Sequence, residues 1–187
     1  MMKFTNIKNS LRELGKFKVI TFGVLFFLIL SALFSGQNNI PPIDRDEARF
    51  AQASRQMVQS NDYINIKFQD EMRAKKPVGI YWLQAASGKI FGLFDIGSFR
   101  IPSLISSIIS IIFTCLIARL IFPFQQSLIV TMFFASSMAF LGEAHLAKTD
   151  ATLLSLICIQ QYFLLKLILK RENTFRFKYL YPTIIWV

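Results

Sequence analysis

The sequence is poor in the residues that build disulfide-rich domains and metal centres. Cysteine occurs twice and histidine once in 187 residues. Cys115 and Cys158 lie in different apolar segments without paired spacing, so we expect two small packing residues and no disulfide. The single histidine, His145, has one glutamate nearby, whereas a metal centre ordinarily needs roughly three or four ligands. The sequence therefore assigns no metal-ligating residues, and a divalent metal cofactor is left open.

Charge is missing from long stretches of the chain. Hydrophobic residues make up 53% of the sequence, twenty residues are Phe, and the mean hydropathy is +0.46. An ordinary soluble domain does not have this composition, so the chain is predicted to be an integral membrane protein. The net charge is +10, but the basic residues cluster beside the apolar runs instead of forming one continuous face. This distribution argues against nucleic acid and favours a membrane and anionic partners.

The apolar runs have the length of membrane-spanning helices. The first, 19–34, carries no charged side chain and follows a tail with five Lys or Arg and one Glu. A signal peptide is the alternative, but its apolar part would be about 7–15 residues long. We predict an all-α membrane protein with about four transmembrane helices and part of a fifth. The segments are a basic tail at 1–18, transmembrane helices at 19–36, 101–122, 127–142 and 150–169, and the start of another at 179–187.

A long outer segment, 37–100, separates the first two predicted spans. Its first part, 37–77, contains seven Lys or Arg and six Asp or Glu. Loops longer than about 12–15 residues usually carry function or secondary structure, so we expect helices here. Asp44 follows two prolines and has Glu47 three residues on, which predicts a capped helix start. Apolar residues then recur at helical spacing, as on a helix along a bilayer surface: Ala48, Phe50, Ala53, Met57 and Val58.

The segment 79–94 decides the topology. It is apolar but short, contains three glycines and Lys89, and opens with an aromatic pair, so an interfacial or re-entrant helix is favoured over a span. This choice puts eleven Lys or Arg on the side of the amino terminus, against seven if the segment crosses the membrane. Because basic flanks are typically cytoplasmic, we predict a cytoplasmic amino terminus in a bacterial inner membrane. Residues 37–100 and the turn at 143–150 then share the outer face.

Charged residues in the two outer segments are candidates for a site, but each also has a structural explanation. Asp46 and Glu47 lie in the first turn of a predicted helix, where the macrodipole stabilises carboxylates without catalysis. Asp150 starts another helix, although a carboxylate at membrane depth also points to a functional site. Lys76 could bind anionic headgroups, but Pro77 restricts its backbone and favours a fixed position. From the residues alone both interpretations stay open.

Four short strings occur in order between residues 40 and 154. They are Asp-Arg-Asp-Glu-Ala-Arg-Phe-Ala, Lys-Lys-Pro-Val-Gly-Ile-Tyr-Trp-Leu-Gln, Phe-Arg-Ile-Pro-Ser and Ala-Lys-Thr-Asp-Ala-Thr-Leu. Together they resemble the amino-terminal part of the ArnT-like membrane glycosyltransferases, relatives of the protein O-mannosyltransferases. The resemblance implies a GT-C-like fold, here truncated, with juxtamembrane helices in the first outer loop. It also implies sugar transfer from a polyprenyl-phosphate donor to a lipid or glycan acceptor of the cell envelope, such as lipid A.

By position in these strings, the resemblance assigns catalytic roles to Asp46, Glu47 and Asp150 and substrate-binding roles to Arg49 and Lys76. The donor leaves as a phosphate anion, so Lys and Arg would stabilise the charge that develops on the leaving group. An acceptor hydroxyl needs a general base, and we expect Asp46 to be that base with Asp150 in support.

Two departures from the family pattern shape the functional expectation. Lys75 and Val78 stand where the family often has an acidic residue and usually a second proline, so the resemblance supplies no assured metal ligand. Members of the family are also much longer. We therefore expect this chain to form the front part of the family's fold. Either it comes from a split or decayed gene, or a second polypeptide supplies the rest. Whether the chain alone is an enzyme is left open.

Two other classes of protein compete with the transferase. The chain could be a non-catalytic membrane subunit or an inactive remnant that binds anionic lipid or a partner protein. It could instead be part of a transporter, but the sequence shows no inverted repeat and no matched pair of broken helices, which are typical of secondary transporters.

Overall fold

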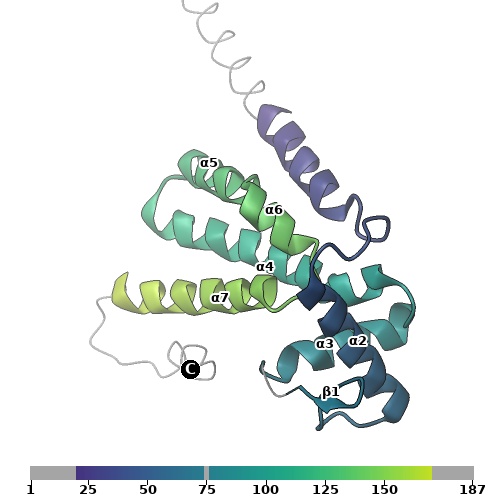
Figure 1. The fold of residues 1–187 in the computed structure, drawn as a ribbon. Coiled ribbons are helices and arrows are strands. Elements are labelled where there is room, and N and C mark those ends of the chain that lie inside the picture. Colours follow the sequence, from purple (N-terminus) through teal and green to yellow (C-terminus); the bar gives the residue numbers. More distant parts are fainter. Residues whose placement is uncertain (1–19, 74–75, 170–187) are drawn as a thin grey trace, which may run out of the picture.

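The computed structural model describes residues 20–73 and 76–169, which are mostly helical (Figure 1). The described part begins with an apolar helix, Ile20–Phe34. The predicted tail at 1–18 and the helix start at 179–187 lie outside the described residues. The other elements are α2 Arg45–Ser60, β1 Lys67–Phe68, β2 Glu71–Met72, α3 Gly79–Phe91, α4 Ile96–Ile121, α5 Phe124–Ala135, α6 Met138–Ala144 and α7 Asp150–Leu169.

Helices α4 and α7 pack side by side in the apolar half of the molecule (Figure 1). Both are long and apolar enough to cross a membrane. Ser106 Oγ of α4 donates a hydrogen bond to Thr152 Oγ1 of α7 at 3.3 Å, and Thr114 Oγ1 lies 4.0 Å from Cys158 Sγ. Both cysteines are free. Small side chains allow two helices in a membrane to approach closely, which explains the serine-rich buried face of α4.

The interval 127–142, expected to be one transmembrane helix, is divided between two helices. Helix α5 ends at Ala135, α6 begins at Met138, and the two are bent by 65°. Ser137 between them has an extended backbone, with φ −66° and ψ 135°, which interrupts the helical hydrogen-bond ladder. By length and composition, the described residues hold two spans, or three if the bent pair is one span. Helix Ile20–Phe34 is apolar but shorter in its described part.

Helix α2 begins where the sequence predicts. Asp44 is its N-cap, and the carboxylate accepts a hydrogen bond from the backbone N–H of Asp46 at 3.0 Å, which satisfies a free donor of the first turn. The apolar face of α2 has a different environment from the one expected. Phe50 and Met57 are buried in a cluster with residues of α3, so this face packs on protein and not on lipid. The sequence pattern is the same in both cases, because either partner is apolar.

Helix α3 is a short helix between α2 and α4. Its 13 residues are fewer than the roughly 20 that a transmembrane helix needs. One face packs against α2 and α4, and a Cβ at Gly88 would lie 3.0 Å from the Phe99 ring of α4. The other face exposes Trp82, Leu83, Ile90 and Phe91. This two-sided character suits an interfacial helix, and its place in a membrane stays a prediction.

Candidate functional site

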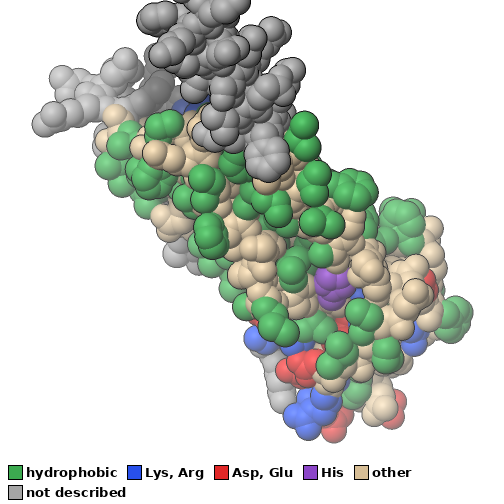
Figure 2. All heavy atoms as spheres, turned by 90° about the horizontal axis from the view of Figure 1, so that it is seen from above, with side chains coloured by type: hydrophobic (Ala, Val, Ile, Leu, Met, Phe, Trp, Pro, Cys, Tyr) green, Lys and Arg blue, Asp and Glu red, His purple; other side chains and the backbone are tan. Residues whose placement is uncertain are grey.

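Charged side chains gather where α2 and α7 begin, next to each other between the apolar helices and the part formed by α2, α3 and β1 (Figure 1). Figure 2 shows acidic and basic side chains close together near one end, whereas apolar side chains cover much of the remaining face. Two segments contribute: residues 44–49 at the start of α2 and residues 143–150 before and at the start of α7. The ion pair of Asp44 with Lys148 and a hydrogen bond from the Ala147 N–H to Glu47 join these segments, and a second ion pair holds Glu47 against Arg100 of α4.

Asp44 and Lys148 form the first, partly exposed link. Lys148 Nζ contacts Asp44 Oδ2 directly. The hydrogen bond from Lys148, followed by the one from the Asp46 N–H, lowers the pKa of Asp44 below its usual value. Desolvation lowers the pKa of Lys148, but its hydrogen bond to Asp44 and nearby carboxylates outweigh this effect and raise that pKa overall. Both groups are therefore charged at neutral pH, and the link is electrostatic.

Glu47 and Arg100 form the second link, which is fully buried. Both side chains are 0% exposed. Arg100 Nε donates to Glu47 Oε1 at 2.7 Å, and Arg100 Nη2 donates to Glu47 Oε2 at 3.2 Å. Glu47 Oε1 also accepts from the Ala147 N–H at 3.1 Å, and Oε2 accepts from the Ile43 N–H at 3.3 Å. One carboxylate thus joins α2, α4 and the segment that leads into α7.

The remaining donors of Arg100 bind the connection between the first apolar helix and α2. Nη1 donates to the carbonyl oxygens of Gln37 at 2.7 Å and Ile40 at 2.8 Å, and Nη2 reaches the Pro41 carbonyl at 3.4 Å. Buried charges are tolerated when they are paired and hydrogen-bonded, and this arrangement meets both conditions. Glu47 was predicted to be catalytic; its carboxylate is buried and bonded to Arg100 and to two backbone N–H groups, and its role in catalysis stays a prediction.

Asp46, the neighbour of Glu47, lies in the opposite environment. Its side chain is 56% exposed. Arg49 Nη1 lies 3.5 Å and Arg73 Nη2 lies 4.0 Å from Asp46 Oδ1. The two guanidinium groups come from different parts of the chain, one turn along α2 and just after β2. An accessible carboxylate is therefore flanked by two cations that can also bind an anion.

Arg73 is held in place by aromatic side chains. Its guanidinium carbon lies 5.3 Å from the ring centroid of Phe50 and 6.0 Å from that of Phe68. Arg73 Nε donates to Tyr81 Oη at 3.1 Å, and the side chain is only 11% exposed. Cation–π contacts and the hydrogen bond fix the guanidinium beside Asp46. The β1–β2 hairpin, which the sequence did not predict, carries Phe68.

Lys76 and Asp150 are exposed. Asp150 is the first residue of α7 and accepts a hydrogen bond from Thr149 Oγ1 at 3.3 Å. It lies two residues after Lys148, so the ion pair of Lys148 with Asp44 brings its segment to the start of α2. Lys76 follows Arg73 by three residues, and Arg73 contacts Asp46. The structure therefore brings together the segments that hold Asp46, Glu47, Arg49 and Asp150, whereas the place of Lys76 at the site stays a prediction.

Arg100 is a site residue that sequence reasoning did not select. It lies in the string Phe-Arg-Ile-Pro-Ser and directly precedes the apolar run 101–122. An arginine at the edge of such a run needs a partner, and that requirement is the signal that could have identified it. The partner could not be chosen from the sequence, because six Asp or Glu lie in 37–77 alone.

His145 connects the turn before α7 to the end of the first apolar helix. Its Nδ1 lies 2.7 Å from the Leu141 carbonyl oxygen and its Nε2 lies 2.9 Å from the Ser35 carbonyl oxygen. These contacts leave the ring without a free nitrogen for a metal. Across residues 20–73 and 76–169, no three His, Cys, Asp or Glu side chains gather as a metal-ligand set, so the geometry names no ligands for the divalent metal left open above.

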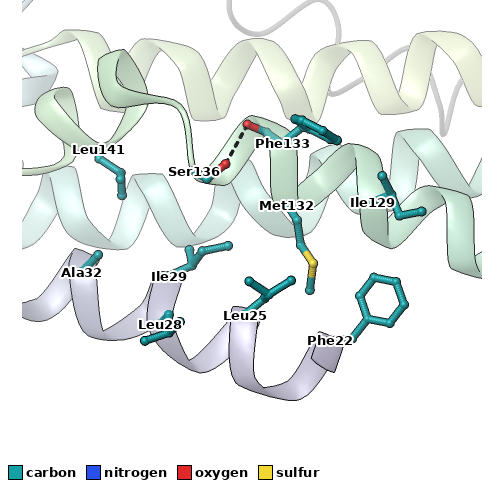
Figure 3. A pocket seen from close by; sticks show the side chains of 10 residues that line it. All are labelled: Phe22, Leu25, Leu28, Ile29, Ala32, Ile129, Met132, Phe133, Ser136 and Leu141. Atoms are coloured by element: carbon teal, nitrogen blue, oxygen red, sulfur yellow. Dashed lines mark hydrogen bonds between the residues drawn. The ribbon is translucent and has the colours of Figure 1, made fainter. Parts of the chain in front are cut away.

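An apolar groove of about 410 Å³ lies between helix Ile20–Phe34 and α5 (Figure 3). Phe22, Leu25 and Ile29 line one wall. Met132 and Phe133 of α5 line the other, and Ser136 donates a hydrogen bond to the Phe133 carbonyl oxygen at 3.3 Å. The groove contains no charged side chain, so it is separate in character from the charged site.

Comparisons with known sequences support the resemblance. Residues 75–187 match the family model for dolichyl-phosphate-mannose-protein mannosyltransferases. The chain is 30% identical over 146 residues to the undecaprenyl phosphate-alpha-4-amino-4-deoxy-L-arabinose arabinosyl transferase of Pseudomonas aeruginosa strain UCBPP-PA14, which covers 75% of this chain and 24% of the relative. The protein of the same name from Yersinia pestis strain Pestoides F is 30% identical over 129 residues, 68% of this chain and 23% of that protein. The chain thus spans about a quarter of the length of these relatives.

Solved structures show the same fold. ArnT from Cupriavidus metallidurans bound to undecaprenyl phosphate superposes with a TM-score of 0.76 at 20% sequence identity, over 86% of this chain and 30% of that chain. The apo state of the same enzyme gives a TM-score of 0.74 over 88% of this chain and 30% of that chain. The likeness confirms the helical GT-C-like fold that the resemblance implies.

Proposed function

Because the chain belongs to the dolichyl-phosphate-mannose-protein mannosyltransferase family, we propose that it serves a membrane glycosyltransferase that uses a polyprenyl-phosphate sugar donor. The observation that carries this proposal is the exposed Asp46 carboxylate at the start of α2, flanked by Arg49 and Arg73 and joined through the Asp44–Lys148 ion pair to the segment that holds Asp150. Basic groups beside an accessible carboxylate are what sugar transfer from a phosphate leaving group requires.

In the proposed step, cations stabilise the leaving group and carboxylates act on the acceptor. The bond between the sugar carbon and the donor phosphate oxygen breaks, and the phosphate leaves with the electron pair. Arg49 and Lys76 stabilise that negative charge. The acceptor hydroxyl forms the new bond to the sugar carbon, and its proton passes to Asp46, with Asp150 orienting the acceptor.

The ion pairs of Asp46 are compatible with these separate roles of cations and carboxylates. Arg49 Nη1 and Arg73 Nη2 lie 3.5 Å and 4.0 Å from the Asp46 carboxylate. A donor phosphate would compete with Asp46 for Arg49 while Arg73, held by its aromatic neighbours, keeps its place. Binding of the donor would therefore free one side of Asp46 for the acceptor.

We further propose that the site faces the outer side of the bacterial inner membrane and that the amino terminus is cytoplasmic. The acceptor would be a lipid or another glycan of the cell envelope. A second polypeptide as a partner in the membrane is also part of the proposal. No metal ion is assigned to the step.

Donor binding provides the first test. The full 187-residue chain in lipid nanodiscs is incubated with undecaprenyl phosphate that carries a photoreactive label, and labelling is compared with that of the K76A and R49A variants. Lys89 is an exposed lysine on α3, so K89A is the matched control for loss of one positive charge. We expect labelling to fall in K76A and R49A and to persist in K89A.

Equal labelling of all variants, or equal competition by phosphatidylglycerol, would instead favour a non-catalytic subunit that binds anionic lipid. Sugar transfer is measured in a second assay with a radiolabelled polyprenyl-phosphate sugar. There, D46N should abolish transfer while photolabelling by the donor persists, because Asp46 acts on the acceptor.

A further inference from the structure

The buried pair Glu47–Arg100 has a role in the site that neither residue would have alone. We infer that this pair is the positioning element of the site: it fixes the start of α2 against the turn before α7 and so sets the spacing between Asp46 and Asp150. The functional significance of that spacing rests on the proposed function. The contacts themselves are independent of it.

The position of Glu47 in the chain places it directly beside the site. It follows Asp46, the candidate base, and its Oε1 accepts from the N–H of Ala147, three residues before Asp150. Arg100 binds the same Oε1 at 2.7 Å and holds it from the α4 side. A shift of this carboxylate would therefore move both halves of the site relative to each other.

Backbone hydrogen-bond donors surround Glu47, whereas backbone acceptors surround Arg100. The Glu47 end faces two backbone donors, the N–H groups of Ile43 and Ala147. The Arg100 end faces backbone acceptors only, the carbonyl oxygens of Gln37, Ile40 and Pro41. An exchange of the two charges would place a guanidinium against N–H groups and a carboxylate against carbonyl oxygens. The pair therefore differs from an ordinary ion pair, whose charges can be exchanged with partial rescue.

Arginine is also required in place of lysine at position 100. Three nitrogens of the guanidinium reach separate acceptors, Nε and Nη2 on Glu47 and Nη1 on two carbonyl oxygens. A lysine ammonium is a single point of charge and cannot span these positions. We expect R100K to keep the charge and lose the backbone contacts, so that the connection before α2 loosens.

Cysteine crosslinking tests the spacing directly. A crosslink between D44C and K148C, in a C115A/C158A background, reports the distance between the start of α2 and the turn before α7. In the wild-type chain these two positions form an ion pair. A short bifunctional methanethiosulfonate reagent is applied to the full chain in nanodiscs. We expect the yield of this crosslink to fall severalfold in E47Q, fall partly in R100K, and not recover in the exchange variant E47R/R100E.

A second crosslink controls for general unfolding. T114C with the native Cys158, in a C115A background, reports the α4–α7 contact, which involves neither Glu47 nor Arg100. The inference predicts that this crosslink keeps its wild-type yield in E47Q and R100K. Equal loss of both crosslinks would mean that loss of the pair disturbs the α4–α7 contact as much as the site, and this would overturn the positioning role. Full recovery in E47R/R100E, or an unchanged D44C–K148C yield in E47Q, would overturn it too.

Because crosslinking needs no donor, it separates this inference from the proposed function. If the wild-type chain fails to be labelled by undecaprenyl phosphate, the proposed function fails while the crosslinks still decide whether the pair positions the two segments. If labelling succeeds and the crosslinks do not respond to E47Q, the proposed function stands and the inference is wrong.

Discussion

Asp46 and Glu47 are neighbours at the start of α2 and yet lie in opposite surroundings. The Asp46 side chain is 56% exposed between two arginines, whereas Glu47 is 0% exposed and bonded to Arg100 and two backbone N–H groups. Successive residues of a helix point about 100° apart, so neighbouring carboxylates can face solvent and core. The comparison separates two carboxylates that the sequence treated alike: one is accessible, as the proposed base must be, and the other is enclosed, as the proposed positioning role requires.

Removal of each carboxylate tests this comparison with the largest expected effect. E47A leaves the Arg100 guanidinium buried without its counter-charge, which typically destabilises a protein by about 3–5 kcal/mol. D46A removes two longer ion pairs of a carboxylate that is 56% exposed, and pairs of an exposed carboxylate are each worth about 1 kcal/mol or less. The free energy of unfolding is measured in mixed detergent micelles by circular dichroism. Similar losses in the two variants would contradict the division between the carboxylates.

Two phenylalanines offer the same contrast between packed and exposed positions. Phe50 is 2% exposed in the α2–α3 cluster and Phe94 is 84% exposed, and each has an arginine over its ring. F50A should cost about 3 kcal/mol, because it leaves a cavity between α2 and α3. F94A should change the free energy of unfolding by about 0.5 kcal/mol or less. A large cost for F94A in detergent would show that this ring is packed and not exposed.

The smallest expected effect concerns the exposed link, Asp44–Lys148. Its contribution is present at neutral pH because the pKa of Asp44 is lowered, and it is lost as pH falls below the ordinary value of 3.8 through the lowered folded-state pKa. The pKa of Lys148 is raised, so its contribution is present below the ordinary value of 10.5 and is lost as pH rises through the folded-state pKa.

Unfolding measured from pH 2 to 7 for wild type and K148M checks this expectation. The difference between the two should be constant near neutral pH and shrink on the acid side, where the Asp44 carboxylate becomes protonated. K89M is the control, since Lys89 is an exposed lysine of α3. A difference between wild type and K148M that grows at low pH would have the wrong sign for this pair.

Local signals in the sequence predicted much of the fold. The cap at Asp44 and the start of α7 at Asp150 agree with the structure, and the short apolar helix expected in 79–94 is present as Gly79–Phe91, because capping chemistry and apolar periodicity act over a few residues. The break between α5 and α6 was missed, since Ser136 and Ser137 occur as readily inside a membrane helix as at its end. The partners of Arg73 were missed too, because they come from α2, β1 and α3.

The sequence by itself determined the class of the protein, its apolar helices and the residue types of its charged site. Those properties follow from composition and from interactions between residues close together in the chain. Only the tertiary structure decided which carboxylate is buried and which is open. That choice depends on Arg100, 53 residues from Glu47, because the packing of α4 beside α2 determines which side of the helix faces the core.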